Sequence, residues 1–289
     1  MRLRWQSKTV LLLVAPAVGA NLVLQTRWWS RNDIGVAIWT LGLSALLGLV
    51  AWKLRSATAP AAAMGFAITA TMMYATMTFP YRPWRNALLP VMAVLVLTAL
   101  ATRLGRSRKE KLGTAENRKG RSAAQVAANL GIAALLSSEF AQTLLANAGW
   151  LRLHRLDTAA VFAAGLAALC EAAADTVSSE LGQVLSSQPR MITTLRAVAA
   201  GTDGAISLGG TAAGLLASGV VATAGALALD GGWFLFMTGC AGGAFGLFFD
   251  SLLGATIERR GWLNNDAVNF LSTASAAGAA LVLLAVYSR

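Results

Sequence analysis

The sequence predicts an all-α membrane protein, a polytopic bundle of about nine transmembrane helices. Of its 289 residues, 56% are hydrophobic and only 13% are charged, with a mean hydropathy of +0.59. Soluble domains carry about 25% charged residues, so most of this chain must face lipid or other apolar helices. The apolar runs have the length that a helix needs to cross a bilayer, and they are too continuous for barrel strands.

Nine apolar segments are expected to form the spanning helices. In order, they lie near 9–26, 34–52, 58–79, 86–103, 122–149, 157–180, 205–229, 232–256 and 266–287. The first four hold few polar groups, so residues 1–102 are interpreted as a transmembrane scaffold. The last five hold nearly all the candidate chemistry, so residues 103–289 are interpreted as a catalytic bundle that begins with a basic loop at 103–121.

Basic residues indicate the orientation of the bundle. Alternate loops collect 17 Lys and Arg residues on one side and 7 on the other. Because cytoplasmic loops carry the excess of basic residues, the amino terminus is expected in the cytoplasm and the carboxyl terminus outside. The protein is therefore predicted to lie in the inner (cytoplasmic) membrane, with its active site facing the cytoplasm.

The net charge of +11 narrows the expected partners. Its basic residues sit in short loops between apolar runs, which favours anionic headgroups and anionic substrates and argues against nucleic acid. Cys170 and Cys240 both lie in apolar runs and form neither a disulfide framework nor a zinc spacing. No feature of the sequence indicates the oligomeric state.

Three carboxylates inside apolar runs are the strongest functional signal. Glu171 and Asp175, spaced i and i+4, share a face of the sixth segment, and Asp250 lies in the eighth. An ionised carboxylate at hydrocarbon depth costs about 2.5–3.5 kcal/mol, so such groups line a wet cavity, pair with a cation or hold a metal. Asp175 and Asp250 each follow the expected start of their segment by 18 residues. Both are therefore expected in one layer near the cytoplasmic leaflet.

Polar residues of three other segments are expected to reach the same layer. The fifth segment starts with Arg121, Gln125 and Asn129, and polar residues also open the seventh and ninth segments. Such a cavity suits phosphate chemistry, because carboxylates bind Mg²⁺, helix amino termini attract anions and arginine forks match phosphate oxygens. The glycines of 201–214 would let the backbone approach phosphate closely.

Several of these features have a purely structural alternative. The glycines at 239, 242, 243 and 246 are expected to be helix-packing positions, since small residues let membrane helices approach each other. For the glycines at 209, 210 and 214, packing and phosphate binding both stay open. The basic loop could serve only to set topology, and Gln125 and Asn129 could form interhelical hydrogen bonds.

Four motifs resemble those of a known family. They are LGTAENRKGRSAAQVAANLG, CEAAADTVSSELGQ, GTDGAISLGGTAAG and GLFFDSLLGATIERRGWLNNDAVNFLST. The series resembles the integral membrane family that includes the chloroplast phytyl-phosphate kinases, and it covers most of the chain. The strings ADTVSSELG and GTDGAISLGG are also similar to a looser pattern in dolichol kinases and phosphatidate cytidylyltransferases.

The resemblance implies a kinase that converts phytyl or geranylgeranyl monophosphate to the diphosphate, with a nucleoside triphosphate, expected to be CTP, and Mg²⁺. It implies catalytic roles for Glu171, Asp175, Asp250 and Asp266, and metal ligation by Asp175, Glu180, Asp203 and Asp250. The implied substrate- and nucleotide-binding residues are Asn117, Arg118, Arg121, Gln125, Asn129, Ser179, Thr202, Ser207, Asn264, Asn265 and Asn269.

Two alternatives remain at this point. The first is another enzyme, a lipid alcohol kinase or a CTP-dependent cytidylyltransferase. The second is a cation- or proton-coupled transporter that uses the intramembrane carboxylates. The unequal polar content of the two halves weighs against a transporter, since many transporters are built from paired halves.

Overall fold

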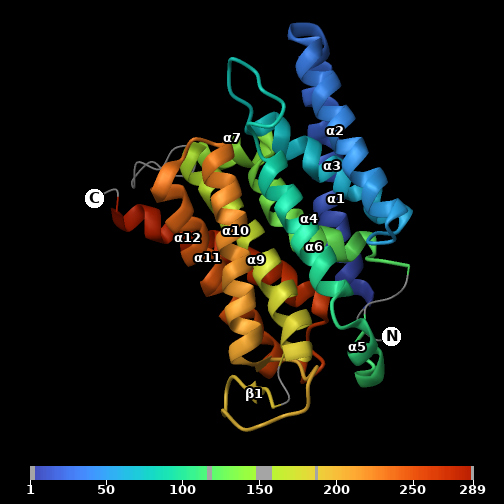
Figure 1. Ribbon diagram of the computed structural model, residues 1–289. Coiled ribbons are helices and arrows are strands. Elements are labelled where there is room, and N and C mark those ends of the chain that lie inside the picture. The colour runs from blue at the N-terminus through green and yellow to red at the C-terminus, as the bar shows by residue number, and fades with distance from the viewer. Residues whose placement is uncertain (1–3, 116–118, 148–157, 186–187, 288–289) are drawn as a thin grey trace.

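A computed structural model describes residues 4–115, 119–147, 158–185 and 188–287, and it is a helical bundle (Figure 1). The first helices are α1 (Arg4–Asn32), α2 (Ile34–Lys53), α3 (Ala59–Ala75), α4 (Leu88–Arg103), α5 (Arg106–Leu112), α6 (Ala123–Leu136) and α7 (Glu139–Asn147). They are followed by α9 (Thr158–Leu185), α10 (Leu208–Ala228), α11 (Gly232–Leu253), the π-helical turn η1 (Gly254–Glu258) and α12 (Asn265–Tyr287). Between α9 and α10, strands β1 (Arg190–Met191) and β2 (Ala205–Ile206) pair antiparallel, with Arg190 opposite Ile206.

The prediction of a polytopic helical bundle is confirmed, while the number of full-length spans differs from nine. Within the described residues, six helices are long and apolar enough to cross a membrane: α1, α2, α9, α10, α11 with η1, and α12. A seventh span is obtained only if α4 and α5, bent by 65° at their junction, count as one. The remaining two predicted spans correspond to the shorter helices α3 and α6.

Two segments depart from the sequence prediction for local reasons. The expected single helix over 122–149 ends at Leu136, because the Ser137 and Ser138 hydroxyls donate to the carbonyls of Ala133 and Leu135 and divide it into α6 and α7. The basic stretch 103–121 is not simply a loop, since it contains α5. Gly105, with φ of +62°, supplies the left-handed turn between α4 and α5.

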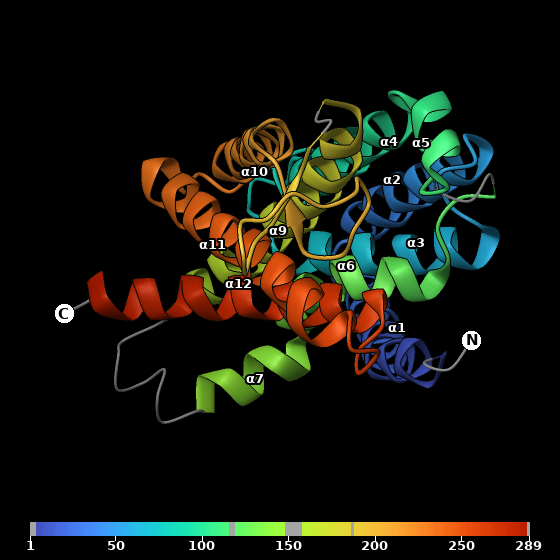
Figure 2. The ribbon, with the colours of Figure 1, turned by 90° about the horizontal axis from the view of Figure 1, so that it is seen from below.

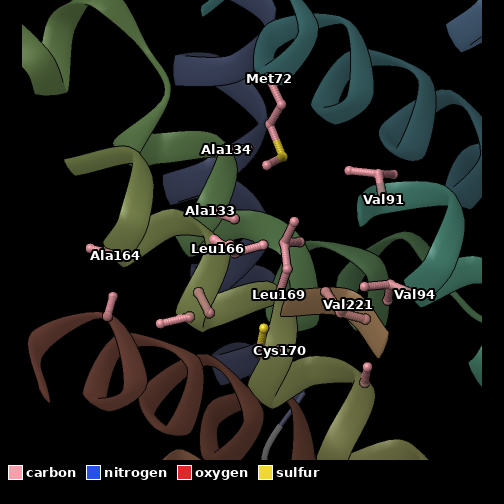
Figure 3. Close-up of a cluster of buried hydrophobic side chains, with 14 of the residues drawn as sticks. Met72, Val91, Val94, Ala133, Ala134, Ala164, Leu166, Leu169, Cys170 and Val221 are labelled. Atoms are coloured by element: carbon pink, nitrogen blue, oxygen red, sulfur yellow. The ribbon is translucent and has the colours of Figure 1, made fainter. Parts of the chain in front are cut away.

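Helix α9 forms the centre of the bundle, as the view from below shows (Figure 2). It packs against α4, α6, α10, α11 and α12. In its most apolar stretch of 18 residues, 89% of the residues are buried inside the protein. Its many alanines let the neighbouring backbones approach closely. The core around it includes Leu166 and Leu169 of α9, Val221 of α10 and Met72 of α3 (Figure 3).

The glycines of α11 are packing positions, as predicted. A Cβ atom at Gly243 would lie 2.8 Å from the Cβ of Cys170, and one at Gly242 would lie 2.6 Å from the Cβ of Ala167. At Gly246 it would lie 2.4 Å from the Cγ of Glu171. The close approach of α11 to α9 therefore requires glycine, which has no side chain, at these three positions.

One end of the bundle gathers the starts of α1, α3, α6, α10 and α12 and the ends of α2, α4, α9 and α11. Three contacts establish this arrangement. Ser7 of α1 donates to Asp266 of α12 (2.5 Å), Thr58 before α3 donates to the Arg121 carbonyl (3.1 Å), and Arg103 donates to the Leu54 carbonyl (2.8 Å). Because the basic loops counted above lie at this end, it is the strongly positive end of the protein.

Candidate functional site

A polar cavity of about 360 Å³ opens at the positive end, between α6, α9, α10, α11 and α12. We call it the carboxylate cavity. It brings together predicted site residues from position 121 to position 269. These are Arg121, Gln125, Asn129, Asp175, Ser179, Glu180, Thr202, Asp203, Ser207, Asp250, Asn265 and Asn269.

Asp175 of α9 and Asp250 of α11 both line this cavity and interact electrostatically with each other. The Asp250 Oδ2 atom is buried and has no hydrogen-bond partner. Across the cavity, Arg121 interacts electrostatically with Asp175, and its Nη2 atom donates to the Thr176 hydroxyl at 3.3 Å. A buried carboxylate oxygen without a partner is costly, so this oxygen is available to a cation or a proton donor.

Glu171 lies one helical turn from Asp175 on α9, beneath the cavity. It is 1% exposed, and its Oε1 atom also lacks a hydrogen-bond partner. It does not line the carboxylate cavity itself, but it interacts electrostatically with Asp175 and with Asp250. The structure therefore places Glu171 as an inner neighbour of the aspartate pair.

Glu180 has a partner that the sequence did not indicate. Its Oε2 atom accepts from Nζ of Lys109 at 2.5 Å, and its Oε1 atom accepts from the Thr102 hydroxyl at 3.2 Å. Lys109 is fully buried and also donates to the Ala101 carbonyl at 2.7 Å. Although Glu180 borders the cavity, these bonds hold both of its oxygens, which argues against the metal-ligand role expected for it.

Amide and hydroxyl groups on the other walls make structural hydrogen bonds while they line the cavity. Asn269 donates to Asn129 across α12 and α6 at 3.3 Å, as expected for an interhelical bond. Gln125 accepts from the backbone N–H of Ser122 in a capping box, and the Ser207 hydroxyl caps α10 by accepting from Gly210 N–H at 3.1 Å. These bonds orient the polar walls before any ligand arrives.

The segment 200–205 forms another wall of the cavity. Gly201 and Gly204 both have positive φ, and a Cβ atom at Gly204 would lie 2.2 Å from the backbone nitrogen of Ala255 in η1. Glycine is therefore required for this segment to lie directly on η1. The contact brings the exposed Asp203 near Glu258, and both line the cavity with Asp175.

Besides Glu171, four predicted site residues lie away from the cavity or outside the described residues. Asp266 accepts from Ser7 of α1, and Asn264 donates to the same serine at 2.9 Å while capping α12. Neither lines the cavity, because the first turn of α12 directs them toward α1. Asn117 and Arg118 fall in 116–118, which lies outside the described residues.

The cavity also contains residues that were not selected from the sequence, notably Thr114, Gln183 and Glu258. Thr114 and Gln183 hydrogen-bond to each other and join the segment after α5 to α9. Glu258 stands beside two arginines at the end of an apolar run and so resembles an ordinary interfacial residue. Only the π-helical turn directs it inward, and no sequence pattern indicated that turn.

The donor set fits Mg²⁺ bound together with a phosphorylated ligand. Within the described ranges, no group of three or more Asp, Glu, His or Cys side chains could hold a metal by itself. Proteins commonly hold Mg²⁺ through one or two carboxylates, with water and substrate phosphates as the other ligands. Asp175 and Asp250, with the partnerless Oδ2 atom of the latter, match that pattern.

Comparison with known proteins places the chain in a family. The family model for integral membrane protein DUF92 matches residues 42–277. The chain belongs to the DUF92 family. This DUF92 match includes every residue of the carboxylate cavity.

Individual relatives of this DUF92 protein come from archaea, plants and cyanobacteria. The chain is 44% identical over 108 residues to an uncharacterized membrane protein of Methanocaldococcus jannaschii, covering 37% of this chain and 45% of that one. It is 30% identical over 223 residues to the chloroplastic protein VTE6 of Arabidopsis thaliana, covering 71% and 60%. An uncharacterized membrane protein of Synechocystis is 32% identical over 194 residues, covering 66% and 70%. The matches thus span less than two thirds of the archaeal and plant proteins, and no solved structure matches.

Proposed function

We propose that this protein is a membrane phosphotransferase that converts a prenyl monophosphate, phytyl or geranylgeranyl phosphate, to the diphosphate. The donor is a nucleoside triphosphate, with CTP the expected one, and Mg²⁺ is the cofactor. The observation that carries the proposal is the meeting of three charged side chains in one polar cavity at the positive end of the bundle: Asp175 of α9, Asp250 of α11, and Arg121, which lies just before α6. The motif resemblance to phytyl-phosphate kinases supports the choice of substrate.

The chemistry needs little from the protein beyond positioning. An oxygen of the acceptor phosphate attacks the terminal phosphorus of the nucleotide, the bond to the bridging oxygen breaks, and a nucleoside diphosphate leaves. Because the acceptor is already a phosphate monoester, no strong general base is required. Phosphoryl transfer passes through a loose transition state, so alignment and charge neutralisation provide the rate enhancement.

Each group of the cavity has a defined task in this proposal. Bound Mg²⁺ would neutralise phosphate charge, with Asp175 and Asp250 as its protein ligands. Arg121 offers a planar fork that fits phosphate oxygens, and its attraction to Asp175 holds it at the cavity wall. The segment 200–205 lines the cavity, and its task in this proposal is to limit access of water to the transferred phosphate.

The direct test is a transfer assay with purified protein in lipid nanodiscs. Phytyl phosphate, Mg²⁺ and a nucleoside triphosphate labelled at the terminal phosphate should give labelled phytyl diphosphate. The product also separates the enzyme alternatives. Lipid monophosphate formed from the alcohol would indicate an alcohol kinase, and a cytidine-containing lipid with release of pyrophosphate would indicate a cytidylyltransferase.

A cation- or proton-coupled transporter is the second candidate. It is favoured by the buried Glu171, whose partnerless Oε1 atom lies deeper in the bundle than the aspartate pair. Intramembrane carboxylates of this kind form proton relays in transporters. Proton-coupled flux into liposomes in the absence of nucleotide would favour this candidate over the kinase.

A further inference from the structure

A second cavity lies beside the carboxylate cavity and differs from it in chemistry. It measures about 80 Å³ and is enclosed by α2, α3, α4 and α6. Glycine, alanine and aliphatic side chains form most of its wall, among them Gly48, Gly65, Val91 and Val94. We call it the apolar slot. Figure 3 shows Val91 and Val94 on α4 at the edge of the hydrophobic core.

The two cavities meet at two polar side chains. Arg121 and Asn129 line the apolar slot and also line the carboxylate cavity. Arg121 additionally lines a third cavity of about 520 Å³ near the end of α4, which contains Arg55, Arg103 and Arg106. Arg121 therefore stands where an apolar slot, a basic vestibule and the aspartate pair adjoin.

The apolar slot lies along a loosely packed seam of the bundle, between α4 and the pair α2 and α3. Helix α4 packs mainly on α9 and α10, and it contacts α2 and α3 only slightly. Exposed apolar side chains, such as Leu46 of α2 and Val96 of α4, flank this seam and are suited to lipid. The sparse contact between α2 and α4 makes this seam the expected route for a ligand that enters from the lipid.

An amphipathic anion is the ligand that satisfies both sides of this junction. A polar ligand in the slot would lose its hydrogen bonds to water without replacement, which is unfavourable. An apolar ligand without an anionic end would form no ion pair with the Arg121 guanidinium at the polar end of the slot. When a phosphate binds Arg121 and a hydrocarbon chain attached to it fills the slot, the anionic group lies beside a cation and the apolar chain lies among apolar side chains.

We propose that the apolar slot binds the hydrocarbon chain of the prenyl monophosphate acceptor, and that Arg121 holds its phosphate facing Asp175 and Asp250. This inference rests on the proposed function and specifies where the lipid substrate binds. The slot takes the part of the chain next to the phosphate, and the rest lies in the seam between α2 and α4. The arginines of the third cavity attract the anionic headgroup as it enters.

Gly65 allows the slot to be blocked without disturbing the backbone. A Cβ atom at Gly65 would meet nothing within 4 Å, so the side chain of Gly65→Leu would extend into the slot. Gly42→Leu is the matched control, because Gly42 also meets nothing within 4 Å and lies exposed on α2 outside the slot. Both variants are prepared in nanodiscs beside the unaltered protein.

The experiment combines kinetics with a binding readout. We expect Gly65→Leu to raise the KM for phytyl phosphate by about tenfold or more and to remove the preference for phytyl over dimethylallyl phosphate, since the slot is filled. A phytyl phosphate analogue with a photoreactive diazirine near the phosphate should label peptides of α3 and α4 in Gly42→Leu and not in Gly65→Leu. Thermal stabilisation by Mg²⁺ and nucleotide should be the same in both variants.

The result that overturns the proposal is equal behaviour of Gly65→Leu and Gly42→Leu in both KM and photolabelling. In that case phosphotransfer by the unaltered protein still supports the proposed function, and only the place of the chain is wrong. If the unaltered protein transfers no phosphate to any prenyl phosphate, the proposed function fails. The photolabelling comparison then decides by itself whether the slot binds a lipid phosphate.

Discussion

Lys109 of α5 and Glu180 of α9 form a buried ion pair, with 2.5 Å between Nζ and Oε2. The pair fixes the bent α4–α5 unit against the central helix, and it stands at the edge of the carboxylate cavity. A buried charge that loses its partner is left uncompensated in a medium of low dielectric constant. The pair is therefore a sensitive point of the structure.

We expect Lys109→Met to lower the free energy of unfolding by about 3–5 kcal/mol, because Glu180 would remain buried without its partner. The double variant Lys109→Met with Glu180→Leu should recover much of this loss. Thermal unfolding in nanodiscs measures both. Glu110→Gln is the control, since the exposed Arg106–Glu110 pair should contribute less than about 1 kcal/mol. Equal losses in Lys109→Met and Glu110→Gln would contradict the prediction.

Gly246→Ala should be destabilising by about 1–3 kcal/mol, because the added methyl group would overlap Glu171 Cγ at 2.4 Å and Ala276 Cβ at 2.8 Å. The same variant should displace Glu171 and so weaken any activity that depends on it. Gly278→Ala, where a Cβ atom meets nothing within 4 Å, should leave the unfolding temperature close to that of the unaltered protein. A neutral Gly246→Ala would show that α11 shifts easily.

Asp175→Asn and Asp250→Asn should each reduce kcat/KM for prenyl phosphate by about 10²-fold or more, as expected when a charge that organises the transition state is removed. The stability of Asp250→Asn should not fall, since Asp250 Oδ2 is buried without a hydrogen-bond partner and burying such a carboxylate is itself unfavourable. Turnover and unfolding are measured on the same preparations. Normal turnover in both variants would remove the proposed metal site.

Asp266→Asn separates the two groups of acidic residues that the sequence placed together. Because Asp266 accepts from Ser7 of α1 and does not line the cavity, its loss should affect the docking of α1 on α12. We expect a lower unfolding temperature, with KM values for nucleotide and lipid unchanged. Ser7→Ala should reproduce the effect. A loss of turnover as large as that of Asp250→Asn would contradict the prediction and indicate a catalytic role for Asp266.

Arg121→Lys tests whether binding of the prenyl phosphate depends on the planar guanidinium group of Arg121 or only on its positive charge. Lysine keeps the positive charge but offers a point donor in place of two parallel N–H groups. We expect the KM for the prenyl phosphate to rise by about tenfold, with a smaller change in the KM for nucleotide, as the loss of one charge-assisted hydrogen bond predicts. Steady-state kinetics with each substrate varied in turn provides the measurement. An unchanged KM for the lipid would argue for a role of Arg121 in nucleotide binding.

The helical class and the polar layer could both be predicted from the sequence, because each follows from local quantities. Runs of apolar residues must form helices in lipid, since every backbone polar group needs an internal partner. The depth of Asp175 and Asp250 follows from counting residues along two such helices. Periodicity also places Gln125 and Asn129 on one face of α6, and both line the cavity, as does Arg121, which lies just before the helix instead of in its first turn.

Tertiary structure alone decided which polar groups are already occupied and where helices bend. The sequence could not distinguish Lys109 from the other basic residues near it, since only the 65° bend brings it to Glu180. Likewise, Asp266 and Asn265 are adjacent in the sequence, but the direction of α12 turns the first toward α1 and the second into the cavity. Sequence determines which side chains lie at a given depth, because rise per residue is a local property. Their partners depend on rotation and packing between helices, which no single segment specifies.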